Sequence, residues 1–251
     1  MSDTTGLRAA IIGLIGFAAL EEELLLAVAA RTTREVGSPE RWAAAPLVAH
    51  NTEFKDQQVQ RLEAIERGET PPSFGEIDHS SAEVYLSYAA QADDLVAAGS
   101  RRTTQAMIDG VASIGDDDLL DPSRHPWLGG RMLWLQLIVR GFWHPTGHLG
   151  DYYLAHGQPD RGVGLQQQAV AVAEYLAAPE AARGMAYYNL ACAQARAASL
   201  DDATRSLQEA ILLNPDVAAN AQRDADLASL RSGGRLEAVL ARFPPTAASQ
   251  R

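Results

Sequence analysis

The sequence predicts an all-α protein. Apolar residues recur at helical spacing through most of the 251 residues, and 47% of the chain is hydrophobic, enough for a sizeable core. No window shows sustained alternation of apolar and polar residues with β-branched enrichment, which would be typical of strands. Loops rich in proline and glycine separate the helical stretches. Four long helices with two crossover-length loops favour a four-helix bundle, and shorter alanine-rich helices follow it.

The first two helices are predicted in the N-terminal third of the chain. An apolar helix is expected from about residue 7 to 34. Ser38 and Pro39 then favour a second helix start, because serine is a good N-cap and proline suits the first helical position. This second helix is expected to run to Arg67 and to stop at Gly68.

The third and fourth helices are predicted on either side of a polar loop. After PPSFGEIDHSS, a cap at Ser80 or Ser81 is expected to open the third helix, which reaches roughly Ser113. The segment GDDDLLDPSRHPWLGG is predicted as a loop. The fourth helix is expected to start near Arg131 and to end at His156.

A different, alanine-rich pattern follows Gly157. The segment AYYNLACAQARAASLDDATRSLQEAILLNP resembles a tetratricopeptide repeat, with one departure at Gln194, where the repeat usually has Tyr. The matching positions are Tyr187, Leu190, Ala191, Ala198, Ala203, Leu207, Ala210 and Pro215. Such repeats generally present a concave groove to a protein partner, so the resemblance implies a binding surface here.

A fainter copy of the same template lies upstream, at Leu149, Gly150, Tyr153, Gly157 and Ala169. The fourth bundle helix would then also serve as the first helix of a repeat. We therefore expect a bundle over 1–157, a repeat-like helical region with a terminal cap over 158–243, and a disordered tail over 244–251.

Composition and charge argue against two classes of partner. The net charge of −11 disfavours nucleic acid and anionic membrane surfaces, which need Lys and Arg. The run AAIIGLIGFAAL is shorter than the roughly 20 residues that span a bilayer, and no cleavage site follows it. Cys192 is the only cysteine, so an intramolecular disulfide is impossible, and its apolar surroundings indicate a small buried hydrophobe. We expect a soluble, cytoplasmic protein.

Two histidines stand out in GFWHPTGHLGDYYLAHG. His144 and His148 are four residues apart, so on a helix they face the same side and could bind one divalent metal with a third ligand from elsewhere. Pro145 between them removes a hydrogen bond to the carbonyl of Gly141, which costs ~3 kcal/mol in a regular helix interior. Either the helix kinks there and still directs both imidazoles inward, or a new helix starts at Pro145 and leaves His144 flanking it.

The remaining histidines differ in their surroundings. His50 lies in the apolar stretch WAAAPLVAHNTEF, where it could be a core histidine satisfied by a hydrogen bond or a third ligand. His79 and His125 fall in predicted loops, where solvated or capping roles are the usual ones. His156 is near a helix end, where a cationic side chain interacts favourably with the helix dipole.

One histidine in the second helix and HxxxH in the fourth resemble the DinB/YfiT-like superfamily over roughly residues 7–157. The resemblance implies that His50, His144 and His148 bind zinc, nickel or iron, with positions left open for water or substrate. It also implies several chemistries of bacterial type. One is a metal-dependent transferase or isomerase that uses a low-molecular-weight thiol such as mycothiol or bacillithiol on a small-molecule electrophile, and another is a related detoxifying enzyme such as a hydrolase. Sulfoxide synthases are disfavoured, because Gly150 stands where their HxxxHxE motif has glutamate.

Two carboxylates are candidate helpers of these ligands. Glu53 follows His50 by three residues and Asp151 follows His148 by three, so each could hold a ligand's other ring nitrogen or act as a general base. Exposed surface carboxylates are the alternative. Three aromatic residues near predicted helix ends or loops could line a substrate mouth or simply pack; they are Trp42, Phe74 and Trp127. No arginine cluster or glycine-rich loop marks a cofactor phosphate.

The competing class is a non-catalytic scaffold. In that case the histidines are structural, and the repeat-like groove binds a protein partner. Stoichiometric metal and thiol reactivity would separate the two classes. The apolar first helix would also suit a homodimer.

Overall fold

The computed structural model describes residues 4–31, 37–39, 41–74 and 82–243. Most of these residues are helical, and their only β-type pairing is an isolated bridge between Ser38 and Arg41, so the all-α prediction is confirmed. The chain divides into two compact units, Met1–His148 and Leu149–Arg251.

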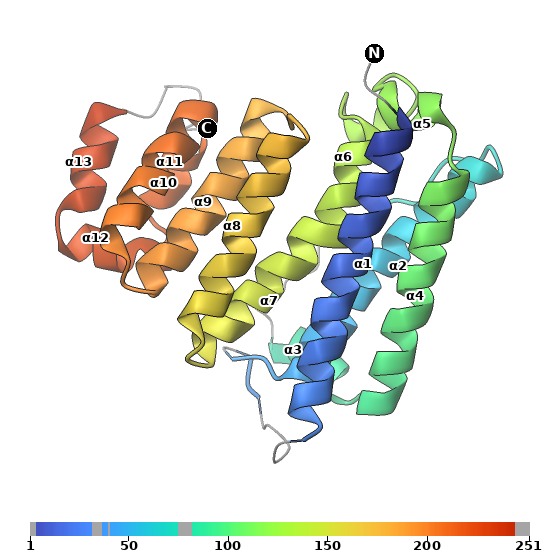
Figure 1. The fold of residues 1–251 in the computed structure, drawn as a ribbon, viewed down its shortest axis with the longest axis horizontal. Helices are drawn as coiled ribbons and strands as arrows, with labels where there is room; N and C mark the ends of the chain where they lie inside the picture. The colour runs from blue at the N-terminus through green and yellow to red at the C-terminus, as the bar shows by residue number, and fades with distance from the viewer. Residues whose placement is uncertain (1–3, 32–36, 40, 75–81, 244–251) are drawn as a thin grey trace. The chain divides into compact units, whose positions relative to one another are not determined.

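The first unit is built from three long helices and a composite one (Figure 1). Its elements are α1 (Thr4–Ala29), α2 (Ala44–Glu66), α3 (Ala82–Ala89), α4 (Asp93–Ser113), α5 (Asp116–Leu120), the 3₁₀ turn η1 (Pro126–Leu128), α6 (Leu133–Ile138), the π-helical turn η2 (Val139–Trp143) and the start of α7 (His144–Ala155). Helix α4 packs against both α1 and α2, and α6 and η2 pack against α1. Fully buried side chains such as Ile11, Met107 and Leu137 fill the space between them.

The second helix begins later than predicted. Ser38 does not cap it; instead Ser38 and Arg41 exchange backbone hydrogen bonds of 2.9 and 3.1 Å. The indole of Trp42 donates to the carbonyl of Pro39 at 3.0 Å and closes this turn. Both backbone groups of Ser38 are paired with Arg41 in this turn, so no helix begins there and α2 starts at Ala44. Helix α2 ends at Glu66, close to the predicted end at Arg67.

The predicted third helix is two helices. A break after Ala89 separates α3 from α4, which starts with Asp93 and Asp94 in its first turn, where acidic side chains favour a helix N-terminus. The predicted caps at Ser80 and Ser81 lie outside the described residues, as does His79. The segment predicted as a loop after Ser113 contains two short helical elements, α5 and η1.

A buried ion pair ties three helices of the first unit together. Lys55, the only lysine of the chain, donates from α2 to Glu22 on α1 at 2.6 Å, and their side chains are 1% and 0% exposed. Ser100 on α4 donates to the same carboxylate oxygen at 3.0 Å, and Nζ of Lys55 lies 3.2 Å from Thr104 Oγ1. This network fixes α2, and with it His50, relative to α1 and α4.

Helix α1 presents part of its apolar surface to solvent. Leu20, Leu24 and Val28 are spaced four residues apart and are 54%, 45% and 56% exposed. Even so, none of the described helices combines the length and the apolar character needed to cross a bilayer.

The second unit is a series of short helices joined by tight turns. After the C-terminal part of α7 come α8 (Pro159–Tyr175), α9 (Glu180–Arg196), α10 (Leu200–Leu213), α11 (Val217–Ala221), the 3₁₀ turn η3 (Ala225–Leu227), α12 (Ala228–Ser232) and α13 (Arg235–Arg242). Helices α8, α9 and α10 lie side by side in chain order (Figure 1). Ala203, Leu207, Ala210 and Leu230 are fully buried in its core. The predicted tail over 244–251 lies outside the described residues.

A glycine contact joins the C-terminal part of α7 to α8. The division between the units falls after His148, within α7, and the domain boundary predicted after residue 157 stays a prediction. A Cβ on Gly162 would lie 2.8 Å from the carbonyl oxygen of Gly150 and 2.8 Å from Leu154 Cγ. This close approach, which only glycine permits, packs the C-terminal part of α7 against α8.

Candidate metal centre

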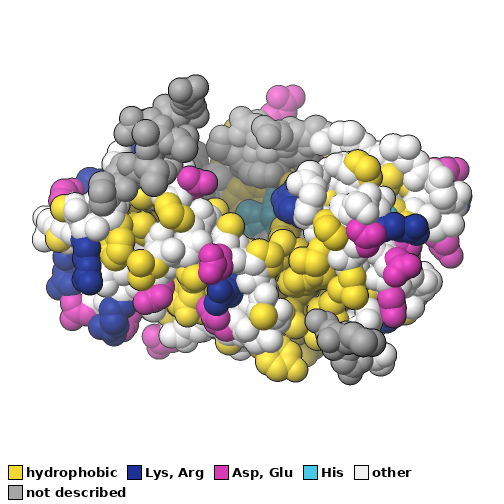
Figure 2. All heavy atoms as spheres, turned by 90° about the horizontal axis from the view of Figure 1, so that it is seen from above, with side chains coloured by type: hydrophobic (Ala, Val, Ile, Leu, Met, Phe, Trp, Pro, Cys, Tyr) yellow, Lys and Arg dark blue, Asp and Glu magenta, His cyan; other side chains and the backbone are white. Residues whose placement is uncertain are grey.

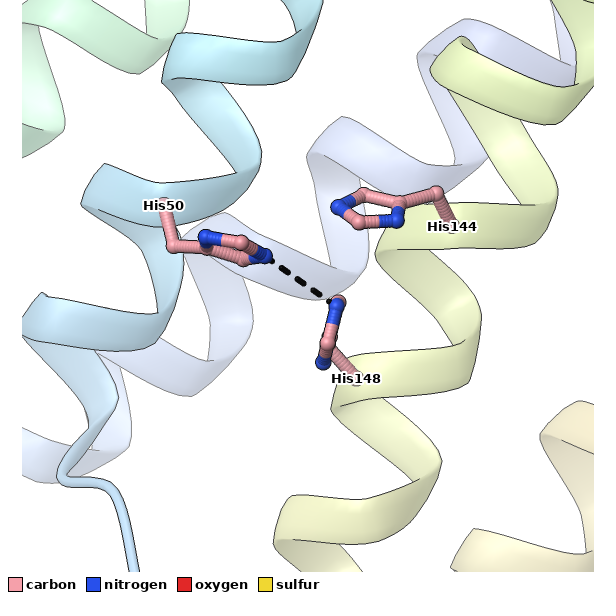
Figure 3. Close-up of side chains that lie close together, drawn as sticks. All are labelled: His50, His144 and His148. Carbon is pink, nitrogen blue, oxygen red and sulfur yellow. Dashed lines mark hydrogen bonds between the residues drawn. The ribbon is translucent and has the colours of Figure 1, made fainter. Parts of the chain in front are cut away.

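The structure brings the three predicted histidine ligands together. His50 from α2 and His144 and His148 from α7 point toward a common centre (Figure 3). The Nε2 atoms of His50 and His148 are 3.1 Å apart, and the three ring centroids are separated by 4.5 to 5.1 Å. His50 is buried, whereas His144 and His148 are partly exposed. Figure 2 shows histidine side chains, coloured cyan, on the face that it draws.

A π-helical turn resolves the position of Pro145. The amide of His144 bonds to the carbonyl of Val139, five residues earlier, and α7 begins at His144. Pro145 is therefore in the first turn of α7, where its missing N–H is not needed. His144 keeps helical dihedral angles, φ −65° and ψ −51°, against the bias that a following proline imposes. Thr146 donates its hydroxyl to the carbonyl of Phe142 at 2.7 Å.

Gly141 lets this irregular segment approach α1. A Cβ at Gly141 would lie 2.6 Å from Ile15 Cγ1 and 3.0 Å from Met107 Cε, closer than real contacts allow. The absent side chain thus seats the π-helical turn against α1 and α4. Such turns are frequent at functional sites, and this one sets the direction of His144.

The donor set fits a divalent metal. Each of the three histidines offers one nitrogen, and these nitrogens lie within 4.8 Å of one another. Tetrahedral zinc with Zn–N bonds of about 2.0–2.1 Å places neighbouring ligand nitrogens roughly 3.3 Å apart, close to the 3.1 Å between His50 and His148. Imidazole also suits nickel and iron, so the ligands alone do not select one of the three metals.

Aromatic rings enclose the buried side of the triad. The ring centroid of Phe54 lies 4.3 Å from that of His144 and 4.9 Å from that of His50. Trp42 and Tyr88 contact His50 with centroids 5.4 and 5.7 Å away. Trp42 therefore packs beside the site, against His50. The rings exclude water and hold the His50 imidazole in one orientation.

Glu53 is hydrogen-bonded to Tyr88, one of the aromatic residues that contact His50. The hydroxyl of Tyr88 on α3 donates a hydrogen bond to Glu53 Oε2 on α2. Burial, and then the bond to Glu53, raise the pKa of Tyr88 well above its ordinary value. The carboxylate thus positions the Tyr88 ring that packs against His50, a role different from the predicted bond to the imidazole.

Tyrosine ionisation reports on this arrangement. Tyr88, and Tyr188 in the second unit, have a raised pKa because of burial, so both are expected to stay protonated above pH 10.0, where exposed tyrosines ionise. In the unfolded chain these tyrosines ionise at the ordinary pKa of 10.0. The free energy of folding that they contribute is therefore fully present below pH 10.0, and it is lost as the pH rises through their raised pKa in the folded protein. Absorbance at 295 nm during alkaline titration measures this, with Tyr88→Phe as the control that removes one delayed group. Ionisation of all tyrosines near the ordinary pKa in the folded protein would contradict the expectation.

The second predicted carboxylate has its own partner. Asp151 lies on α7 and forms an ion pair with Arg196 of α9; its side chain is 59% exposed. This bond joins two helices of the second unit. Asp151 as a helper of His148 stays a prediction.

Cys192 is buried, as predicted, and belongs to a second polar cluster. Its Sγ lies 3.7 Å from Asp224 Oδ2, an oxygen that also accepts a 2.6 Å hydrogen bond from Tyr188. Burial first, and then the charges of Asp224 and Asp226, raise the pKa of the thiol. A thiol held protonated is a poor nucleophile and a poor metal ligand, which favours a structural role.

The sequence prediction missed an arginine pair in the first unit. Arg61 on α2 and Arg140 on η2 come from segments 79 residues apart, so spacing along the chain does not reveal them. One signal was available: Arg61 follows His50 and Phe54 by eleven and seven residues, which is one face of a helix.

Comparison with models of protein families, with curated proteins and with solved structures found no match to this chain.

Proposed function

We propose that the chain binds one divalent metal through His50, His144 and His148 and transfers a low-molecular-weight thiol to a small-molecule electrophile. The convergence of three imidazoles from two helices carries this proposal. Three neutral nitrogen ligands leave coordination positions open, which is typical of catalytic rather than structural sites. The thiol class comes from the resemblance to the DinB/YfiT-like superfamily.

The bound metal would supply Lewis acidity that favours the thiolate form of the co-substrate. The residues of the chain account for the rest of the site. Phe54, Trp42 and Tyr88 form an apolar wall around the buried ligand His50. The wall keeps water from one side, and the partial exposure of His144 and His148 leaves the other side open to small molecules.

Metal content and thiol transfer test the proposal together. Elemental mass spectrometry is expected to find about one zinc, nickel or iron per chain. Metal-loaded protein is expected to accelerate the conjugation of monochlorobimane with mycothiol or bacillithiol, and a chelator is expected to abolish this. His148→Ala should lose both metal and activity.

His156→Ala is the matched control, because His156 directly follows α7 and stacks on Tyr152, with ring centroids 3.9 Å apart. This variant is expected to retain both properties. Wild-type protein that takes up none of the three metals, or conjugation that survives both the chelator and His148→Ala, would refute the proposal.

A further inference from the structure

The first unit also contains a buried arginine cluster, which is centred on Arg61 and includes Arg140 and the indole of Trp127. Arg61 is only 8% exposed. Its guanidinium lies over the rings of Phe74 and Trp127, 4.9 and 5.2 Å from their centroids. Arg140 lies over the ring of Phe54 in the same way, at 4.6 Å. Phe74 and Trp127, predicted either to line a substrate mouth or to pack, thus pack on an arginine.

The cluster consists of hydrogen-bond donors that lack acceptors. Within the described part of the chain, Nε and Nη1 of Arg61, Nε of Arg140 and Nε1 of Trp127 are buried and have no hydrogen-bond partner. Buried polar groups in folded proteins are almost always paired, so four unpaired donors in one region need an explanation. All four can only donate, and the group that would satisfy them must therefore be an acceptor.

The electrostatics indicate that this acceptor is an anion. Burial lowers the pKa of Arg61. The pKa of Arg140 is lowered by burial first, and then by the positive charges of Arg61 and Arg131. No carboxylate of the described residues contributes to either shift, so among these residues the cluster gathers positive charge in a poorly solvated place without a counter-charge.

Cation–π contacts explain only part of this arrangement. A ring below a guanidinium contacts its face, whereas the N–H bonds lie in the guanidinium plane and point outward from its edges. The contacts of the Arg61 guanidinium with Phe74 and Trp127 therefore supply no acceptor to its N–H groups, and Nε and Nη1 stay available to another group. Planar oxyanions such as carboxylates, and phosphates, are the groups that arginine edges bind best.

The cluster is adjacent to the histidine triad. Arg140 precedes His144 by four residues, roughly 6 Å along a helix axis. The ring of Phe54 contacts both residues, with Arg140 Cζ at 4.6 Å and the His144 ring at 4.3 Å from its centroid. A small molecule could therefore place an oxyanion at the arginines and a reactive carbon near the triad.

We propose that Arg61, Arg140 and the indole N–H of Trp127 form a subsite for the carboxylate or phosphate group of a small molecule. That this molecule is the electrophile rests on the proposed function. Anion binding itself does not, because none of the three residues is a metal ligand.

Calorimetric titration of the metal-free full chain tests the subsite. Succinate and inorganic phosphate are titrated separately, at constant ionic strength set by sodium chloride, so that the two arms distinguish a carboxylate from a phosphate. Wild-type protein is expected to bind one of them saturably. Arg61→Met and Arg140→Met are each expected to weaken that binding at least tenfold, because each removes a charge-assisted hydrogen bond.

Arg67→Met is the matched control. Arg67 follows Arg61 closely in sequence, but it is exposed and pairs with Glu69 at 2.8 Å, so its loss should leave anion binding unchanged. The melting temperature is an independent measurement, and in Arg61→Met it is expected to rise while anion binding weakens. This rise is expected in the ligand-free protein, because Arg61→Met removes a buried charge that has no counter-ion among the described residues.

Three outcomes would overturn the subsite. They are no saturable binding of either anion to wild-type protein, equal weakening in Arg67→Met, and a lower melting temperature in Arg61→Met with binding intact. If Arg61→Met does not fold, anion binding to Arg140→Met and to wild-type protein still tests the subsite. His148→Ala separates the two proposals: anion binding that persists there supports the subsite even if no metal binds.

Discussion

Replacing Lys55 with methionine is expected to destabilise the protein by about 3–5 kcal/mol, because it leaves Glu22 as an uncompensated buried charge. The two side chains are 1% and 0% exposed and are joined at 2.6 Å, with Ser100 bonded to the same carboxylate oxygen. Glu22→Leu alone is expected to cost a similar amount, since Lys55 then keeps only its contact with Thr104. Urea unfolding followed by circular dichroism measures both changes.

The double variant Glu22→Leu/Lys55→Met decides whether the cost comes from burying a lone charge. Replacing both partners with apolar groups is often neutral or stabilising, so the double variant is expected to recover most of the lost stability. Disruption of the exposed pair between Arg67 and Glu69 is the control and should change stability little. Additive losses in the double variant would refute the expectation.

Zinc is expected to stabilise the first unit by mass action. At a free concentration about a hundredfold above its dissociation constant, a ligand that binds only the folded state adds roughly 2.7 kcal/mol. This corresponds to an increase in melting temperature of about 2–4 °C per kcal/mol for a unit of this size. Differential scanning fluorimetry with and without zinc measures the shift.

The zinc-induced shift should depend on the triad and on pH. His50→Gln and His148→Ala are expected to abolish it, while His156→Ala, outside the triad, retains it. Metal binding requires neutral imidazoles, so acidification to about pH 5, below the ordinary histidine range, is expected to remove the shift. A shift of equal size in His148→Ala would show that zinc binds elsewhere, for example near Asp224.

The helical content of the protein follows from local sequence. Helical periodicity and the absence of strand patterns predicted the all-α class correctly, and Gly68 ended the second helix as expected. The errors came from turns that depend on backbone contacts. Ser38 has the side chain of an N-cap, but its backbone is used in a bridge to Arg41, so α2 starts at Ala44.

The metal centre was predictable in part. The spacing of His144 and His148 indicated a shared face, but Pro145 made the direction of His144 ambiguous. A π-helical turn seated against Ile15 through Gly141 removed that ambiguity. That turn depends on packing between segments more than a hundred residues apart, which a local pattern does not encode.

The sequence by itself determined the helical class, the apolar faces and the face shared by His144 and His148, because these depend on residues within a few turns of one another. Tertiary structure decided three features that local patterns do not encode: the approach of His50 to the α7 pair, the burial of Lys55 against Glu22, and the meeting of Arg61 with Arg140. The physical reason is the same for all three. A buried side chain can lie beside an opposite charge, beside a like charge or beside another ligand. Which of these neighbours it has depends on the distant helix that packs against it.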